Sequence, residues 1–203
     1  MTGNFEEQEL KDRLNLIENM IAEGRRTTES WGWTFVLWGV AYYVAIAWSA
    51  WGRSSLAWPS TMIVAALLTG VVASRKTGSR PATTIGRAIG SIWIAMGISM
   101  FLLFMSMGIS HRFEEHIFVA IIGAMLGTAN ATSSMILKWK VQFAAAFVWW
   151  ASAVVACFGN EKQTAIGFLV AIFFGQIVFG IYGMIAESRK RRLLGRNQGA
   201  AHA

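Results

Sequence analysis

The side chains best suited to chemistry lie in the six-residue run HRFEEH, residues 111–116. If this run is helical, His111 and Glu115 are four residues apart on one face, a spacing that suits a divalent metal or a hydrogen-bonded pair. His116 and Glu114 extend the set of candidate ligands, acids and bases. Two or three such groups do not make a site by themselves, so we predict a solvated loop without a bound metal. A lipid-handling enzyme that uses His111, Glu114, Glu115 and His116 is an alternative.

A second group of polar residues lies inside apolar sequence. The stretch that follows Gly127 contains Thr128, Asn130 and Ser133, and Gln176 lies in the middle of a later apolar segment. Polar side chains within hydrocarbon need partners or water, because an unsatisfied polar group there is costly. The side chain of Asn130 is expected to face the other helices and to meet Gln176. These residues predict either hydrogen bonds between helices or the lining of a path for a small polar solute.

Other reactive constellations are absent from the sequence. Only three histidines occur, and neither they nor any carboxylate fall within an apolar segment. The sequence contains no GxSxG elbow, phosphate-binding loop or HExxH motif. A membrane haem with two histidine ligands and a proton-coupled carrier are therefore disfavoured. We predict a protein without a cofactor that is not an enzyme.

The elements that carry these residues are six apolar segments free of Lys, Arg, Asp and Glu. A helix needs roughly 20 apolar residues to cross a hydrocarbon core of about 30 Å. The segments comprise residues 31–51, 56–73, 88–109, 117–137, 141–158 and 165–186. We predict an all-α polytopic membrane protein with six transmembrane helices, arranged as three successive helical hairpins if the spacing of the tryptophans reflects a repeat.

Basic residues alternate between the two sides of these segments. Fifteen of the eighteen Lys and Arg residues belong to connections on one side. They are Lys11, Arg13, Arg25, Arg26, Arg75, Lys76, Arg80, Arg87, Lys138, Lys140, Arg189, Lys190, Arg191, Arg192 and Arg196. The other side has only Arg53, Arg112 and Lys162. The positive-inside rule then predicts a bacterial inner-membrane protein with both termini in the cytoplasm. The net charge of +7 is a sign of topology, and no nucleic-acid partner is expected.

Glycine pairs predict where the helices approach one another. Gly123 and Gly127 form one GxxxG motif, and Gly86 and Gly90 form another. Small residues at this spacing let helix backbones come close together in a membrane. Both motifs are expected to mark contacts within the helical bundle.

Residues 1–30 form a separate N-terminal arm with helical periodicity. Four aliphatic residues recur there at spacings of four, three and four, namely Leu10, Leu14, Ile17 and Ile21. We call these four residues the seam. This is the a/d pattern of a helix with one narrow apolar stripe, suited to another helix. Gly24 is expected to interrupt the helix just before the membrane.

Charge distinguishes the arm from the C-terminal tail, residues 188–203. The arm has seven acidic and four basic residues, whereas five basic residues follow the last apolar segment. Basic segments bind the anionic inner leaflet, so the tail is expected to contact anionic lipid and the acidic arm to contact protein.

These observations predict a non-catalytic subunit, sensor or docking partner. The seam would bind another protein or a second copy, and residues 31–187 would form the membrane domain. The alternative is a channel or facilitator for a small neutral or polar solute. Thr128, Asn130, Ser133 and Gln176 would then line its path, with Trp38, Trp93 and Trp150 as constrictions.

Overall fold

The computed structural model describes residues 2–52, 56–76, 84–110 and 114–200. The described chain is helical apart from short connections and contains no strand. Its elements in order are α1 (Thr2–Ser30), α2 (Gly32–Gly52), α3 (Ala57–Lys76), α4 (Thr84–Ile109), α5 (Glu115–Leu137), α6 (Lys140–Phe158), α7 (Glu161–Ile172), the π-helical turn η2 (Phe173–Val178) and α8 (Phe179–Ala200).

Six helical stretches are long and apolar enough to cross a membrane, which confirms the predicted all-α class and the number of candidate spans. The last of them joins α7, η2 and the first part of α8 into one continuous rod over Glu161–Arg189. The π-turn within this rod was not predicted. A π-turn inserts one extra residue into a helical turn and leaves no clear signature in hydropathy.

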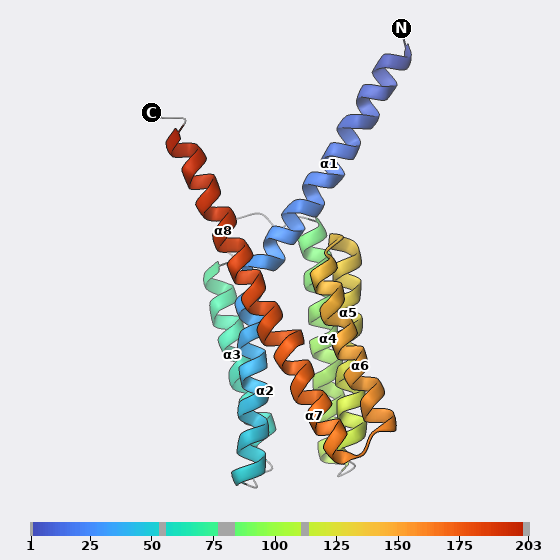
Figure 1. Cartoon of the computed structure of the whole chain (residues 1–203), viewed down its shortest axis with the longest axis vertical. Helices are drawn as coiled ribbons and strands as arrows, with labels where there is room; N and C mark the ends of the chain where they lie inside the picture. The colour runs from blue at the N-terminus through green and yellow to red at the C-terminus, as the bar shows by residue number, and fades with distance from the viewer. Residues whose placement is uncertain (1, 53–55, 77–83, 111–113, 201–203) are drawn as a thin grey trace.

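The helices form two groups joined by the oblique α7–η2–α8 rod (Figure 1). The antiparallel helices α2 and α3 form one group, while α4, α5 and α6 form the other. The most extensive packing joins α5 and α6, which belong to different hairpins of the predicted repeat. Both termini project from the same end of the bundle, referred to below as the terminal end (Figure 1).

Close packing between α5 and α6 depends on the first GxxxG motif. A Cβ atom at Gly123 would lie 2.8 Å from the carbonyl oxygen of Trp149, and one at Gly127 would overlap the indole of Trp150. Trp149 is fully enclosed, and its ring also lies against Gly175 of η2. The motif is thus an internal contact, as predicted, because each glycine leaves room for part of a tryptophan residue.

A second close contact joins α2 to the helical rod, at the point where α2 crosses α8. A Cβ atom at Gly180 would lie 2.6 Å from the carbonyl oxygen of Gly32, and one at Gly32 would lie 2.7 Å from the carbonyl oxygen of Gly180. The Phe35 and Phe179 rings pack edge to face beside this crossing, with centroids 4.9 Å apart. The crossing ties the helical rod to α2, which belongs to the first candidate span.

The predicted interruption of the arm at Gly24 is wrong, because α1 is continuous through this residue. Gly24 instead lets α1 approach the bundle, since a Cβ atom there would meet side-chain atoms of Ile85 and Leu137 at 2.6 and 2.9 Å. Arg25 adds a polar anchor. Its guanidinium donates to the carbonyl oxygen of Lys138 at 3.1 Å and lies 5.8 Å from the centroid of the Trp139 ring.

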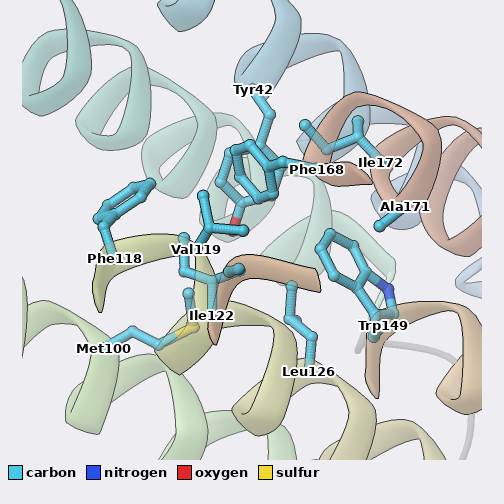
Figure 2. Packing of buried hydrophobic residues seen from close by; sticks show 11 residues of the cluster. Tyr42, Met100, Phe118, Val119, Ile122, Leu126, Trp149, Phe168, Ala171 and Ile172 are labelled. Carbon is cyan, nitrogen blue, oxygen red and sulfur yellow. The ribbon is translucent and has the colours of Figure 1, made fainter. Parts of the chain in front are cut away.

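The core between the two groups is aromatic (Figure 2). The Tyr42 and Phe168 rings lie side by side with centroids 6.1 Å apart, and Val119 and Ile122 pack next to them. Residues of α2, α5 and α7, which are far apart in the sequence, therefore meet in this core. Such packing is expected of membrane helices, because lipid supplies no hydrophobic drive between them.

Candidate docking surface and membrane groove

The seam of α1 is exposed along the part of the helix that projects beyond the bundle (Figure 1). Leu10, Leu14 and Ile17 are 59%, 52% and 52% exposed, whereas Ile21 is half-buried where α1 reaches the other helices. Leu16, on a different face, is also exposed at 60%. Three aliphatic side chains of the predicted seam thus lie on one free helical face.

The heptad register of the seam also fixes the positions of its flanking charges. With Leu14 and Ile21 at a positions and Leu10 and Ile17 at d positions, Arg13 falls at g and Glu18 at e. Within α1, Arg13 forms an ion pair with Glu9. A g position of one strand faces the following e position of its partner in a parallel coiled coil, so Arg13 of one copy would meet Glu18 of another.

The polar residues of α5 point in different directions. Thr128 is exposed, whereas Asn130 and Ser133 are fully buried. The Asn130 amide donates to the carbonyl oxygen of Leu126 at 2.9 Å, a back-bond that the sequence analysis did not anticipate. No hydrogen bond joins Asn130 to Gln176 among the described residues, and the Asn130 Oδ1, Ser133 Oγ and Gln176 Oε1 atoms have no protein partner.

The candidate metal ligands are not gathered into a site. His111 lies outside the described residues, Glu115 is exposed, and His116 lies between helices. His116 Nδ1 is 3.1 Å from both the Ala156 carbonyl oxygen and the Thr164 hydroxyl. Among the residues that the structure describes, no three His, Cys, Asp or Glu side chains come together as metal ligands. The contacts of His116 link α5 to α6 and α7.

A large groove runs between the two groups of helices, with a volume of about 2230 Å³. The backbone of α3 lies beside α2 alone among the described elements, so α3 and α4 form opposite walls whose backbones do not come close together. Gln176 is the one member of the predicted polar path that lines this groove, and Trp38 and Trp93 also line it. Trp150 instead contacts Gly127, away from the groove.

One face of α4 is exceptionally open toward the groove. Gly90, Gly97 and Gly108 line it, and a Cβ atom at any of them would have nothing within 4 Å. The prediction that Gly90 marks a close helix contact is therefore wrong. These glycines share one helical face because their spacings of 7 and 11 residues are close to whole turns. This longer periodicity is the sequence signal that could have indicated the groove.

Comparison with protein-family models, curated proteins and solved structures gives no match for this chain. Its function has to be inferred from the exposed seam, the enclosed polar atoms and the groove.

Proposed function

We propose that this chain is a non-catalytic membrane subunit that assembles with a second copy of itself through α1. The observation that carries the proposal is the exposure of Leu10, Leu14 and Ile17 on a helix that projects from the bundle. Aliphatic side chains at a and d positions are the groups that two helices bury against each other in a coiled coil.

Charge favours a second copy, in parallel orientation, as the occupant of the seam. Arg13 at g and Glu18 at e would form two equivalent ion pairs around a two-fold axis. Two copies in one membrane already share the same orientation, so their arms can pair in parallel without rearrangement. The net negative charge of the arm disfavours the alternative of lying on anionic lipid.

The length of the seam indicates how the pairing would be stabilised. Four seam positions span only about two heptads, which is marginal for free helices in water. Membrane insertion confines both copies to one plane and raises their effective concentration, so a weak helix pair suffices. The anchor of Arg25 on Lys138 further limits the orientations of α1.

Replacing Leu14 and Ile17 by Asp should abolish this dimer, because two carboxylates per chain would have to be buried in the seam. We expect association to weaken by more than about tenfold. The mass of the purified full chain in mild detergent or nanodiscs measures the effect. Leu16→Asp is the matched control, since it adds a charge to an equally exposed leucine off the seam. An unchanged mass for Leu14→Asp plus Ile17→Asp would overturn the proposal.

Cross-linking and charge reversal test the parallel orientation within the same experiment. In a Cys157→Ser background, Leu14→Cys should form a disulfide-linked dimer, because identical a residues face each other only in a parallel pair. Arg13→Glu should weaken the dimer, and adding Glu18→Arg should restore part of it. Equal association of the single and double charge variants would contradict the proposed register.

We further propose that the terminal end of the bundle faces the cytoplasm of a bacterial cell. The basic residues of the arm, of the connections between α3 and α4 and between α5 and α6, and of the tail support this orientation. In a Cys157→Ser background, an impermeant maleimide applied to intact spheroplasts should label Glu161→Cys and leave Lys140→Cys unlabelled until the membrane is opened. Both positions are exposed. Lys140 begins α6, whereas Glu161 begins α7 just beyond the opposite end of α6. The reverse labelling pattern would reject this orientation.

A further inference from the structure

The groove has apolar walls, and aromatic rings contact one another across it toward the far end. Trp93, Met100 and Phe101 line it from α4, and Phe118 and Phe168 line it from α5 and α7. At the end opposite the termini, the Trp58 ring of α3 contacts the Phe118 ring, with centroids 5.0 Å apart. The Phe104 ring of α4 also contacts Phe118, with centroids 4.7 Å apart. Aromatic contacts therefore bridge α3, α5 and α4 at this end.

The mouth at the terminal end is charged. Arg26, Arg75 and Arg87 line it, together with Glu23, Glu29 and Glu187. Arg26 is 3.4 Å from Glu23, and both Glu29 and Glu187 have interaction partners within the protein. Arg75 and Arg87, at the end of α3 and the beginning of α4, form no ion pair with any described residue. Two exposed guanidinium groups thus remain on opposite walls of the mouth.

The distance along α4 from the charged mouth to Gly97 matches the thickness of one leaflet of a bilayer. A helix rises about 1.5 Å per residue, so the ten residues from Arg87 to Gly97 cover about 15 Å, half of a typical hydrocarbon core. A chain anchored at the guanidinium groups would therefore end near Gly97. The glycine face of α4 leaves open space along this length.

We propose that the groove between α3 and α4 binds one anionic phospholipid of the surrounding membrane. Arg75 and Arg87 hold its phosphate, since guanidinium groups pair strongly with phosphate oxygens. An acyl chain lies along Gly90 and Gly97 and contacts Trp93. The lipid enters sideways between α3 and α4, where the described backbones do not touch. This site is independent of the seam on α1.

Native mass spectrometry of the delipidated full chain tests the site, with phosphatidylglycerol and phosphatidylcholine of identical acyl chains as probes. We expect one phosphatidylglycerol to remain bound at concentrations where phosphatidylcholine is lost. Replacing both Arg75 and Arg87 by Gln should weaken retention of phosphatidylglycerol about tenfold. Lys138→Gln plus Lys140→Gln is the control for the loss of two positive charges, because these exposed residues lie at the same end, outside both the groove and the tail.

A steric variant tests the chain-binding part separately. Gly97→Leu places a side chain in the groove, where a Cβ atom meets nothing within 4 Å, and should reduce binding of both lipids. Gly70→Leu on α3 has the same open space at Cβ, lies off the groove and should have no effect. Unaltered binding in Gly97→Leu, or equal losses in the groove variants and their controls, would overturn the proposal. Displacement of the lipid by millimolar inorganic phosphate would likewise reject it in favour of a simple anion site.

Discussion

Replacing Trp149 by Ala is expected to destabilise the bundle by about 3 to 5 kcal/mol, the usual range for removing a large buried aromatic side chain. Trp149 is 0% exposed, and its ring fills the space between α5, α6 and η2. Gly175 lies directly against the indole, and Phe168 lies 6.3 Å from it, measured between ring centroids. A cavity would remain because glycine at position 175 offers no side chain that can move into it.

Unfolding of the purified chain by increasing SDS in mixed micelles, followed by circular dichroism, measures this loss. Trp51→Ala is the matched control, since Trp51 is 88% exposed at the end of α2 and should change the free energy of unfolding little. Trp149→Phe should lie between these variants because it keeps an aromatic ring. Equal stability of Trp149→Ala and Trp51→Ala would show that the α5–α6–η2 packing described above is wrong.

Replacing Gly180 by Leu should also destabilise the bundle, by the opposite mechanism of overpacking. The new side chain would meet the carbonyl oxygen of Gly32 at 2.6 Å, and Val36 and Phe35 follow at 2.8 and 3.0 Å. The carbonyl oxygen belongs to a helix backbone and cannot rotate away, so α2 and α8 must separate. We expect a loss of about 1 to 3 kcal/mol or more.

The same SDS titration compares this variant with Gly70→Leu, whose side chain enters open space. Gly180→Ala should give an intermediate loss, because its Cβ atom already meets the carbonyl oxygen of Gly32. A Gly180→Leu protein as stable as Gly70→Leu would contradict direct backbone contact between α2 and α8. Comparing Gly180→Leu with Gly70→Leu separates the effect of packing from that of helix propensity, since both substitutions replace glycine by leucine within a helix.

The helices could be predicted from the sequence with small errors at their ends. The predicted segment 117–137 corresponds to α5, Glu115–Leu137, and the predicted segment 141–158 corresponds to α6, Lys140–Phe158. Long runs without charge decide these limits because a backbone in hydrocarbon must satisfy its own hydrogen bonds. Glycine weakens a helix in water, which predicts an interruption at Gly24, but it also allows a close contact with Ile85 and Leu137, and α1 continues through it.

The candidate site was predicted only in part. The seam could be identified because its residues are neighbours on one helix, and the exposure of Leu10, Leu14 and Ile17 agrees with a free helical face. Hydropathy could not tell that Thr128 points outward while Asn130 is enclosed, because both lie in the same apolar stretch. Nor could it reveal that the Asn130 amide bonds to Leu126 of its own helix.

The sequence by itself determined the helical class, the six stretches able to span a membrane and the position of the seam, because each depends on residues close together in the chain. Tertiary structure alone decided which glycines pack against another residue and which face open space. Gly127 receives the Trp150 indole, whereas Gly97 faces the open groove. The physical reason is that a glycine only permits close approach, and the neighbouring helix decides whether anything occupies the space.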